Sequence, residues 1–251
     1  MDSTQLDSGT SDLAAGLDEL VQGHRILSME GHDELTLGHL SWRAPNGRGF
    51  WIKRHSISMG EIMGHDDLVL VSFDGEKLEG HGNRHSEWPI HAGIFLARDD
   101  VNSIAHTHAF HATVFGSLTN SKLRAIAHAG AYFAENVPRF TDTAQLIRSA
   151  EGGAAVARAL GDAWALLMRN HGVTFCGHSI RHCVVLGYFL ERACRQQLAL
   201  DGSGLEWEGH TEEEVTTKGA ALMVDQAINM FWDHLGRKLV KYEAGQGVSF
   251  A

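Results

Sequence analysis

The chain is poor in cysteine, with only three among 251 residues. They are Cys176, Cys183 and Cys194, an odd number in which no two form a C-x-x-C pair. A small extracellular fold that depends on disulfides normally carries an even, closely spaced set. We therefore expect no disulfide framework and, by default, a location in the reducing cytoplasm.

Clusters of basic residues and long apolar runs are also absent. The chain has 21 Lys and Arg against 31 Asp and Glu, for a formal net charge of -10. A nucleic-acid surface normally needs a basic patch, so we expect no nucleic-acid partner. No apolar run approaches the length that spans a bilayer, and Met1–Gln5 lacks the basic start of a signal peptide. We therefore expect no membrane partner.

Proline is rare, with three residues, and no low-complexity linker or internal repeat divides the chain. Hydrophobic residues make up 43% and charged residues 21%, as in an ordinary globular protein with a substantial core. We predict a disordered N-terminal tail at 1–11, one domain at 12–240 and a C-terminal tail at 241–251.

Hydrophobic periodicity predicts both helices and strands along this domain. The pattern predicts helices at 13–31, 89–97, 110–118, 141–160, 180–198 and 212–236, and strands within 34–42, 49–53, 67–72, 77–79, 100–109 and 163–169. Asp74-Gly75 predicts a hairpin turn between two of the strands. These elements favour one α/β domain with a central, mostly antiparallel sheet and helices on its faces, although periodicity does not fix the strand order.

Histidine is abundant, with 17 residues, and it is the commonest metal ligand. His106 and His108 lie two apart on the predicted strand 100–109, so their imidazoles point to the same face. Such a pair can share a tetrahedral or trigonal-bipyramidal metal. Two surface histidines are the plain alternative, but the apolar start of this strand indicates burial, and buried imidazoles need partners.

Two further residues extend this pair. His171 follows the apolar run 163–168, at the end of a second predicted strand, where loops form sites in α/β folds. Glu87 comes just before the predicted helix 89–97, a place that the helix dipole alone would explain. In company with three histidines, Glu87 is a candidate fourth ligand, general base, or each in turn.

These motifs together resemble the class II aldolase/adducin family over roughly residues 15–200. The matching pieces are Glu87, Arg98-Asp99-Asp100-Val101 leading into His106-Thr107-His108, and Asn170-His171-Gly172. The resemblance implies a three-layer α/β/α sandwich and a homotetramer with active sites near subunit interfaces. It also implies one divalent metal ion per subunit on His106, His108 and His171, with Glu87 as ligand or acid–base group. The adducin branch lacks the full metal set, which is complete here, so we expect an enzyme.

The phosphate-binding motifs of the family's sugar-phosphate aldolases are altered here. Gly38-His39-Leu40-Ser41 has His in place of Asn, 54–58 lacks the Thr-Gly turn, and His85-Ser86 replaces a Ser-Ser pair. Imidazoles and cations suit a carboxylate or an acidic phenol better than a phosphate dianion. Neutral drift around an unchanged substrate is the alternative.

The segments 38–43, 49–53 and 85–91 are similar to a branch of decarboxylases that act on hydroxylated aromatic or pyridine dicarboxylates. The resemblance implies a metal-dependent carbon–carbon lyase that removes CO2 from a small carboxylic acid through a metal-stabilised, enolate-like intermediate. Zn2+ or Mn2+ is the expected metal, and Fe2+ or Co2+ also suits the ligands. The alternatives are an aldolase or epimerase acting on a sugar phosphate or hydroxy-keto acid, and a non-catalytic adducin-like binding module.

The expected reaction suggests roles for individual residues. Glu87 is the first choice for the acid that protonates the product, with His85 and His128 as others; His128 lies near where aldolases of this family place an interface acid. The predicted substrate-binding residues are His39, Ser41, Arg43, Lys53 and Ser86. The remaining histidines, His91, His111, His178 and His182, are expected to be structural or to lie on the surface.

Overall fold

The computed structural model describes residues 3–119, 122–133 and 136–245, and its centre is an eight-stranded sheet. The strand order is β4-β3-β2-β1-β5-β8-β7-β6, and every neighbouring pair is antiparallel except β6 with β7. The strands are β1 (His39–Arg43), β2 (Phe50–Lys53), β3 (Leu68–Val71), β4 (Lys77–Gly80), β5 (Ser103–Thr107), β6 (Arg139–Phe140), β7 (Ala165–Met168) and β8 (Gly172–Gly177). The predicted sheet is confirmed, including the β3–β4 hairpin.

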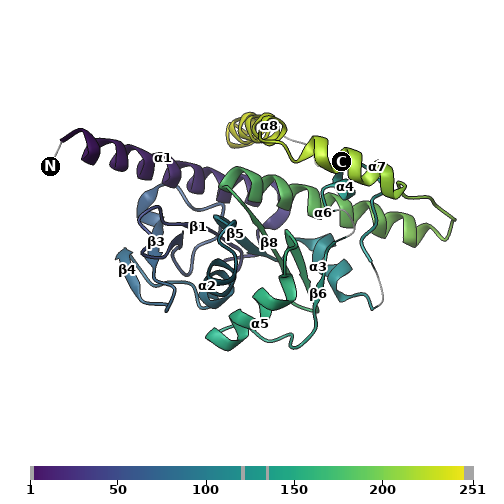
Figure 1. Cartoon of the computed structure of the whole chain (residues 1–251), viewed down its shortest axis with the longest axis horizontal. Coiled ribbons are helices and arrows are strands. Elements are labelled where there is room, and N and C mark those ends of the chain that lie inside the picture. Colours follow the sequence, from purple (N-terminus) through teal and green to yellow (C-terminus); the bar gives the residue numbers. More distant parts are fainter. Residues whose placement is uncertain (1–2, 120–121, 134–135, 246–251) are drawn as a thin grey trace.

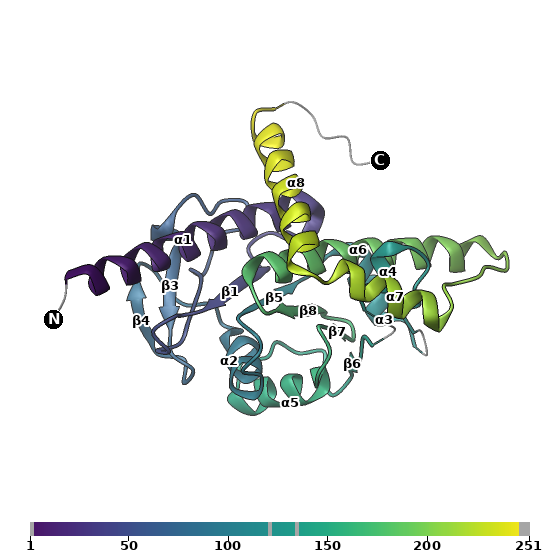
Figure 2. The same ribbon diagram turned by 45° about the horizontal axis from the view of Figure 1, so that its top comes forward.

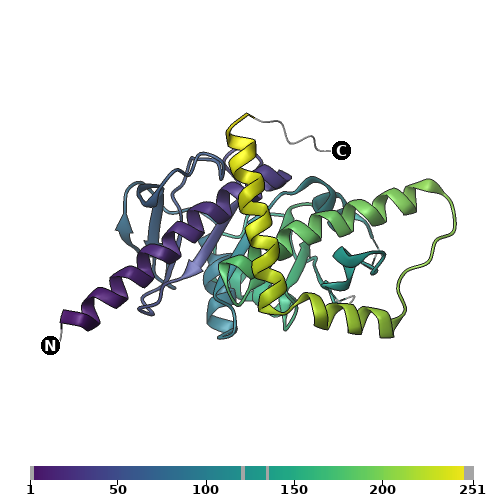
Figure 3. The same ribbon diagram turned by 90° about the horizontal axis from the view of Figure 1, so that it is seen from above.

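Helices cover both faces of the sheet, so the molecule has three layers (Figure 1). One face packs against α1 (Ser3–Leu27), α3 (Phe110–Ser117) and α6 (Ile180–Ser203), and the other against α2 (Trp88–Ala97) and α5 (Ala150–Leu160). The short α4 (His128–Ala131) and α8 (Asp225–Glu243) pack on α6, and α7 (Glu212–Leu222) packs on α4 and α8. Seen from above, α1, α6 and α8 share one side, and the end of α8 projects beyond the body (Figures 2 and 3).

The chain has one hydrophobic core on each face of the sheet. The alternation of side chains along each strand explains why there are two. In β7, Ala165 and Leu167 belong to the core under α6, whereas Leu166 and Met168 belong to the core under α2 and α5. Successive side chains of a strand point to opposite faces, so a strand covered on both sides must be apolar throughout. The same alternation sends the side chains of His39, Ser41 and His106 toward α2.

The boundaries of several helices differ from the prediction. Helix α1 begins at Ser3 and takes in most of the 1–11 segment that we predicted to be a disordered tail. The stretch 141–160 is helical only from Ala150, where the Ser149 side chain caps the helix by accepting the Gly152 N–H. The predicted helix 212–236 is two helices, α7 and α8, and α8 continues to Glu243, beyond the predicted end of the domain. The rest of the predicted C-terminal tail, 246–251, lies outside the described residues.

Two glycines let α2 and α5 pack closely. A Cβ atom on Gly153 would lie 2.1 Å from the carbonyl oxygen of Pro89, and one on Gly93 would lie 2.4 Å from the carbonyl carbon of Gly153. Glycine inside a helix normally weakens it, but at Gly153 the missing side chain is what permits the contact. Within the described ranges, no helix is both long and apolar enough to cross a membrane.

Candidate metal centre

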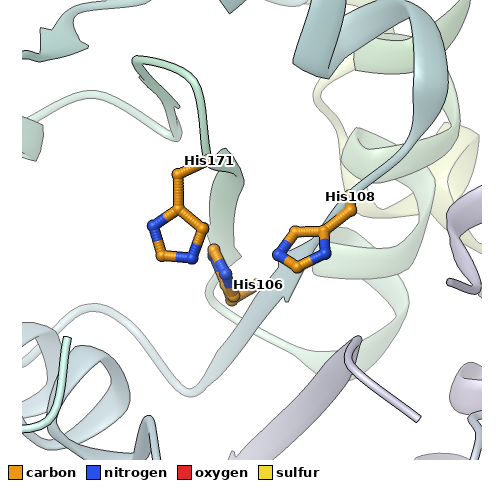
Figure 4. A group of neighbouring side chains, drawn as sticks. All are labelled: His106, His108 and His171. Carbon is orange, nitrogen blue, oxygen red and sulfur yellow. The ribbon is translucent and has the colours of Figure 1, made fainter. Parts of the chain in front are cut away.

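Three histidines from two neighbouring strands meet beside the sheet (Figure 4). His106 lies on β5, His108 directly follows β5, and His171 lies in the turn between β7 and β8. One nitrogen from each ring lies within 4.8 Å of the others. The structure therefore brings together the three residues that we predicted as metal ligands.

The backbone of the β7–β8 turn explains the Asn170-His171-Gly172 motif. Asn170 has φ of +54°, a left-handed conformation that asparagine adopts more readily than most residues. A Cβ atom on Gly172 would lie 2.5 Å from the His108 ring and 2.6 Å from the carbonyl oxygen of Thr107. The turn therefore needs both residues to bring His171 against His108.

The nitrogen atoms that face the centre have no partner of their own. Among the described residues, His106 Nε2, His108 Nε2 and both ring nitrogens of His171 are buried without a hydrogen bond. Buried polar atoms are normally paired. Three unpaired imidazole nitrogens directed at one point are the donor set that Zn2+ and similar divalent cations take. The residues present therefore fit a bound metal ion.

Two side chains behind the ligands fix which nitrogen faces inward. His108 Nδ1 donates to Glu34 Oε2 at 2.7 Å. His106 Nδ1 donates to Thr174 Oγ1 at 3.2 Å, while the Thr174 hydroxyl donates to Met168 Sδ at 3.3 Å. A hydrogen held on Nδ1 leaves the lone pair on Nε2, which is the form that binds a metal.

Removing the Glu34 carboxylate should weaken metal binding without emptying the site. We expect Glu34→Ala to lower Zn2+ affinity by about 10- to 100-fold, the usual effect of losing such a supporting partner. Competition with a chromogenic chelator measures the Zn2+ affinity. Glu61→Ala is the matched control, since Glu61 lies on a neighbouring loop and accepts the Ser58 N–H instead of a histidine. Equal affinities in the two variants would contradict this role.

Glu87 directs its carboxylate at the same cluster. It precedes α2 but makes no capping hydrogen bond, so the helix dipole does not account for its position. Its Oε1 lies 3.5 Å from His171 Nε2 and accepts the Ile147 N–H at 2.9 Å, and its Oε2 lies 3.8 Å from His106 Nε2. Burial alone would raise the pKa of this carboxyl, but His171, His106 and the Ile147 N–H together lower it to about 2. Glu87 is therefore an ionised group at neutral pH.

Two more imidazoles adjoin Glu87. His39 is paired directly with His106 across β1 and β5, and their ring centroids lie 5.3 Å apart. The rings of His39 and His85 lie 4.0 Å apart, and His39, His85 and Glu87 each offer an atom within 4.8 Å of the others. Burial lowers the pKa of His85 to about 3 and that of His39 well below its usual value. Both rings are therefore neutral near pH 7.

Arg43 and Lys53, which we predicted to hold a substrate carboxylate, do not face the site with free donors. Arg43 donates to the carbonyl oxygens of Phe95, Arg98 and Val101, and so ties the end of α2 to β1. Lys53 Nζ donates to the carbonyl oxygens of Thr36 at 2.8 Å and Ile57 at 2.6 Å. Its side chain is fully buried, and this burial lowers its pKa to about 8. Both cations stabilise loops, and we withdraw them as carboxylate ligands.

The other predicted site residues lie at different depths. Ser41 is buried and contacts His91, a residue that we expected to be structural or on the surface. Ser86 is partly buried between His85 and Glu87. His128 is exposed at the start of α4 and belongs to neither histidine cluster of the described chain.

Comparison with known proteins finds a family and several relatives for the chain. The family described as Class II Aldolase and Adducin N-terminal domain matches residues 18–198. The chain is 28% identical over 190 residues to the 3,4-dihydroxyphthalate decarboxylase of Rhodococcus jostii, covering 72% of this chain and 78% of that protein. It is 32% identical over 120 residues to the 5-deoxy-D-ribulose 1-phosphate aldolase of Bacillus thuringiensis serovar kurstaki, covering 46% of this chain and 53% of that one.

A solved structure resembles nearly the whole chain. L-fuculose 1-phosphate aldolase from Glaciozyma antarctica has a TM-score of 0.82 and 25% identity, with 95% of this chain and 93% of that chain covered. The α/β/α sandwich predicted from the sequence is thereby confirmed. Relatives of both reaction types are found at similar, low identity.

Proposed function

Because the chain belongs to the class II aldolase and adducin family, we propose that it is a divalent-metal-dependent carbon–carbon lyase that removes CO2 from a hydroxylated aromatic or heteroaromatic carboxylic acid. The observation that carries the proposal is the complete cluster of His106, His108, His171 and Glu87, flanked by the neutral rings of His39 and His85. A binding module would have no need of four converging ionisable groups. The cluster therefore favours an enzyme.

The roles of the metal and of Glu87 are separate. His106, His108 and His171 would hold a divalent cation, which would supply Lewis acidity toward a substrate oxygen. Glu87 starts as a carboxylate and takes the proton of the substrate hydroxyl on Oε2, the oxygen that does not accept the Ile147 N–H. After CO2 leaves, Glu87 returns that proton to the carbon that carried the carboxylate. The product regains its hydroxyl proton from water as it departs.

The charges around the site support decarboxylation over aldol cleavage of a sugar phosphate. A phosphate dianion needs donors or cations to balance its charge. Arg43 and Lys53 use their donors on carbonyl oxygens, and His39 and His85 are neutral. A carboxylate that leaves as neutral CO2 loses its charge during the reaction, so a cation bound to it would stabilise the ground state and slow the step. Neutral imidazoles beside the carboxylate avoid that cost.

Aldol cleavage is the second candidate, favoured by the relatives that are named as sugar-phosphate aldolases. Both reactions leave electron density on a carbon next to a substrate oxygen, where a cation held by the three histidines would act as a Lewis acid, so one scaffold would serve either. By family resemblance we also propose a cytoplasmic homotetramer, in which His128 of a second copy approaches the site.

A panel of substrates separates the two reactions. We expect the zinc- or manganese-loaded protein to release CO2 from hydroxylated benzene and pyridine dicarboxylates, measured in a coupled bicarbonate assay. The same acids without the hydroxyl group serve as the control and should give no release. Retro-aldol cleavage of a sugar phosphate or hydroxy-keto acid, with no CO2 from any aromatic acid, would refute the decarboxylase proposal.

A further inference from the structure

A row of three buried side chains leads from the sheet to the metal centre. Ser41 Oγ lies 2.6 Å from His91 Nδ1, and His91 Nε2 lies 2.7 Å from His39 Nδ1. All three residues are fully buried. Ser41 and His39 lie two apart on β1 and share its α2 face, so the single ring of His91 reaches both.

The direction of the hydrogen bonds in this row decides what His39 offers to the site. The Ser41 hydroxyl has two acceptors within reach, His91 Nδ1 at 2.6 Å and the carbonyl oxygen of Ile104 at 3.3 Å. The hydroxyl has one hydrogen, and the short contact is the better bond. His91 then carries its hydrogen on Nε2 and donates it to His39 Nδ1. As a result, the hydrogen of His39 is on Nε2.

His39 Nε2 has no protein partner among the described residues, although it is buried. The ring stands beside His85, whose Nδ1 accepts the Glu87 backbone N–H at 3.3 Å. An accepting Nδ1 leaves the hydrogen of His85 on Nε2 as well. Two uncharged N–H groups therefore stand together next to His106, the cross-strand neighbour of His39.

We propose that His39 and His85 are a pair of N–H donors for a substrate carboxylate, and that Ser41 and His91 are positioning residues that keep the hydrogen of His39 on Nε2. This inference rests on the proposed function in one respect, the carboxylic acid substrate. It places that carboxylate beside the metal centre, against donors that recognise its oxygens without adding a positive charge.

The same three groups, His39, His85 and Glu87, are also close enough to hold a second cation. A ring nitrogen that carries a hydrogen cannot bind a metal, so the hydrogen positions derived above exclude this use. Zinc titration of the apo protein should therefore give one equivalent per chain. A second equivalent that disappears in His39→Asn would overturn the proposal.

Nitrogen NMR of the zinc-loaded protein with 15N-labelled histidine tests the hydrogen positions directly, since the two neutral tautomers give different ring shifts. The His39 signals are identified by their loss in His39→Asn. We expect the wild type to show the hydrogen on Nε2, and Ser41→Ala to shift the population toward Nδ1. A wild-type hydrogen on Nδ1, or a Ser41→Ala spectrum identical to that of the wild type, would overturn the assignment.

Ser103→Ala is the matched control. Ser103 is as fully buried as Ser41 on the adjacent strand β5, and its hydroxyl donates to the backbone oxygen of Ser41 at 2.8 Å. The Ser103→Ala variant loses a buried hydroxyl but leaves the His39–His91 contact unchanged. We expect its His39 signals to match those of the wild type.

Binding of salicylate to the zinc-loaded protein, followed by calorimetry, tests the carboxylate. Loss of one neutral hydrogen bond predicts that Ser41→Ala weakens binding by about five-fold, and Ser103→Ala by less than about two-fold. His91→Phe keeps a ring stacked near Phe50 and should weaken binding by about ten-fold. Equal binding in all variants would overturn the donor pair and leave the proposed function standing. Absence of binding even to the wild type would refute the carboxylic acid substrate, and the donor pair with it.

Discussion

His106→Ala is expected to remove both the metal and the activity. Its Nε2 is one of three unpaired nitrogens at the centre. Its ring is fully buried, and its Nδ1 donates to Thr174 Oγ1 on β8. Removing one of the three converging imidazoles should weaken metal binding by more than the roughly 10- to 100-fold that the loss of a supporting partner costs. We expect less than about 0.1 metal equivalent after dialysis, and a fall in kcat/KM of at least about 1,000-fold.

Metal analysis of the dialysed protein, together with a thermal melt of the apo forms, separates loss of the ligand from loss of the fold. His111→Ala is a suitable control, because His111 lies three residues past His108 but its ring bonds to Glu191 on α6. The control should keep a full equivalent of metal. A dialysed His106→Ala protein that keeps one equivalent would show that the centre lies elsewhere.

Part of the candidate metal centre could be predicted because its geometry is encoded locally. The alternation of a strand places His106 and His108 near each other, and the turn at Asn170 and Gly172 is set by the backbone preferences of those two residues. Glu87 was singled out for its company with three histidines, and its carboxylate lies beside His106 and His171 in the structure. Short-range rules placed His106 and His108 together, whereas the grouping with His171 and Glu87 was implied by the family resemblance.

The hydrogen-bond partners of Lys53 and Arg43 could not be predicted, because they depend on contacts between distant segments. Lys53 and Arg43 lie on strands beside the site, and only the tertiary structure shows that loop and helix carbonyls take up their donors. His91 was missed for the same reason, since its spacing within α2 shows no periodicity that would indicate a partner. The available signal was the pair of polar residues His39 and Ser41, two apart on an otherwise buried strand, which requires a polar partner on the covering helix.

The helix boundaries show a similar limit. The stretch 141–149 has apolar residues at helical spacing, but the structure uses Ile147 to donate its N–H to Glu87, which a continuous helix would not allow. A segment that serves the site therefore departs from its local preference. The strand order is likewise a property of the whole chain, and nothing in the periodicity indicates that β8 lies between β5 and β7.

Glu87→Gln should separate catalysis from metal binding. The amide keeps an oxygen for the Ile147 N–H, so the side chain should stay in place. It cannot take up a proton from the substrate, and the loss of a general acid–base group typically costs about 100- to 10,000-fold in rate. We expect kcat to fall within that range while the protein keeps most of its metal after dialysis. Single-turnover CO2 release and metal analysis on the same preparation measure the two effects.

The pH dependence of the wild type provides an independent check. Because the pKa of Glu87 is lowered to about 2, its carboxylate is ionised from pH 5 upward, and activity should not fall on account of Glu87 between pH 8 and pH 5.

If Glu87 were instead mainly a ligand, Glu87→Gln would lose its metal in dialysis to the same extent as His106→Ala. If the Glu87→Gln enzyme kept both its metal and its turnover, another group would have to transfer the proton. His85, which stands beside Glu87 with a hydrogen on Nε2, would then be the next residue to replace.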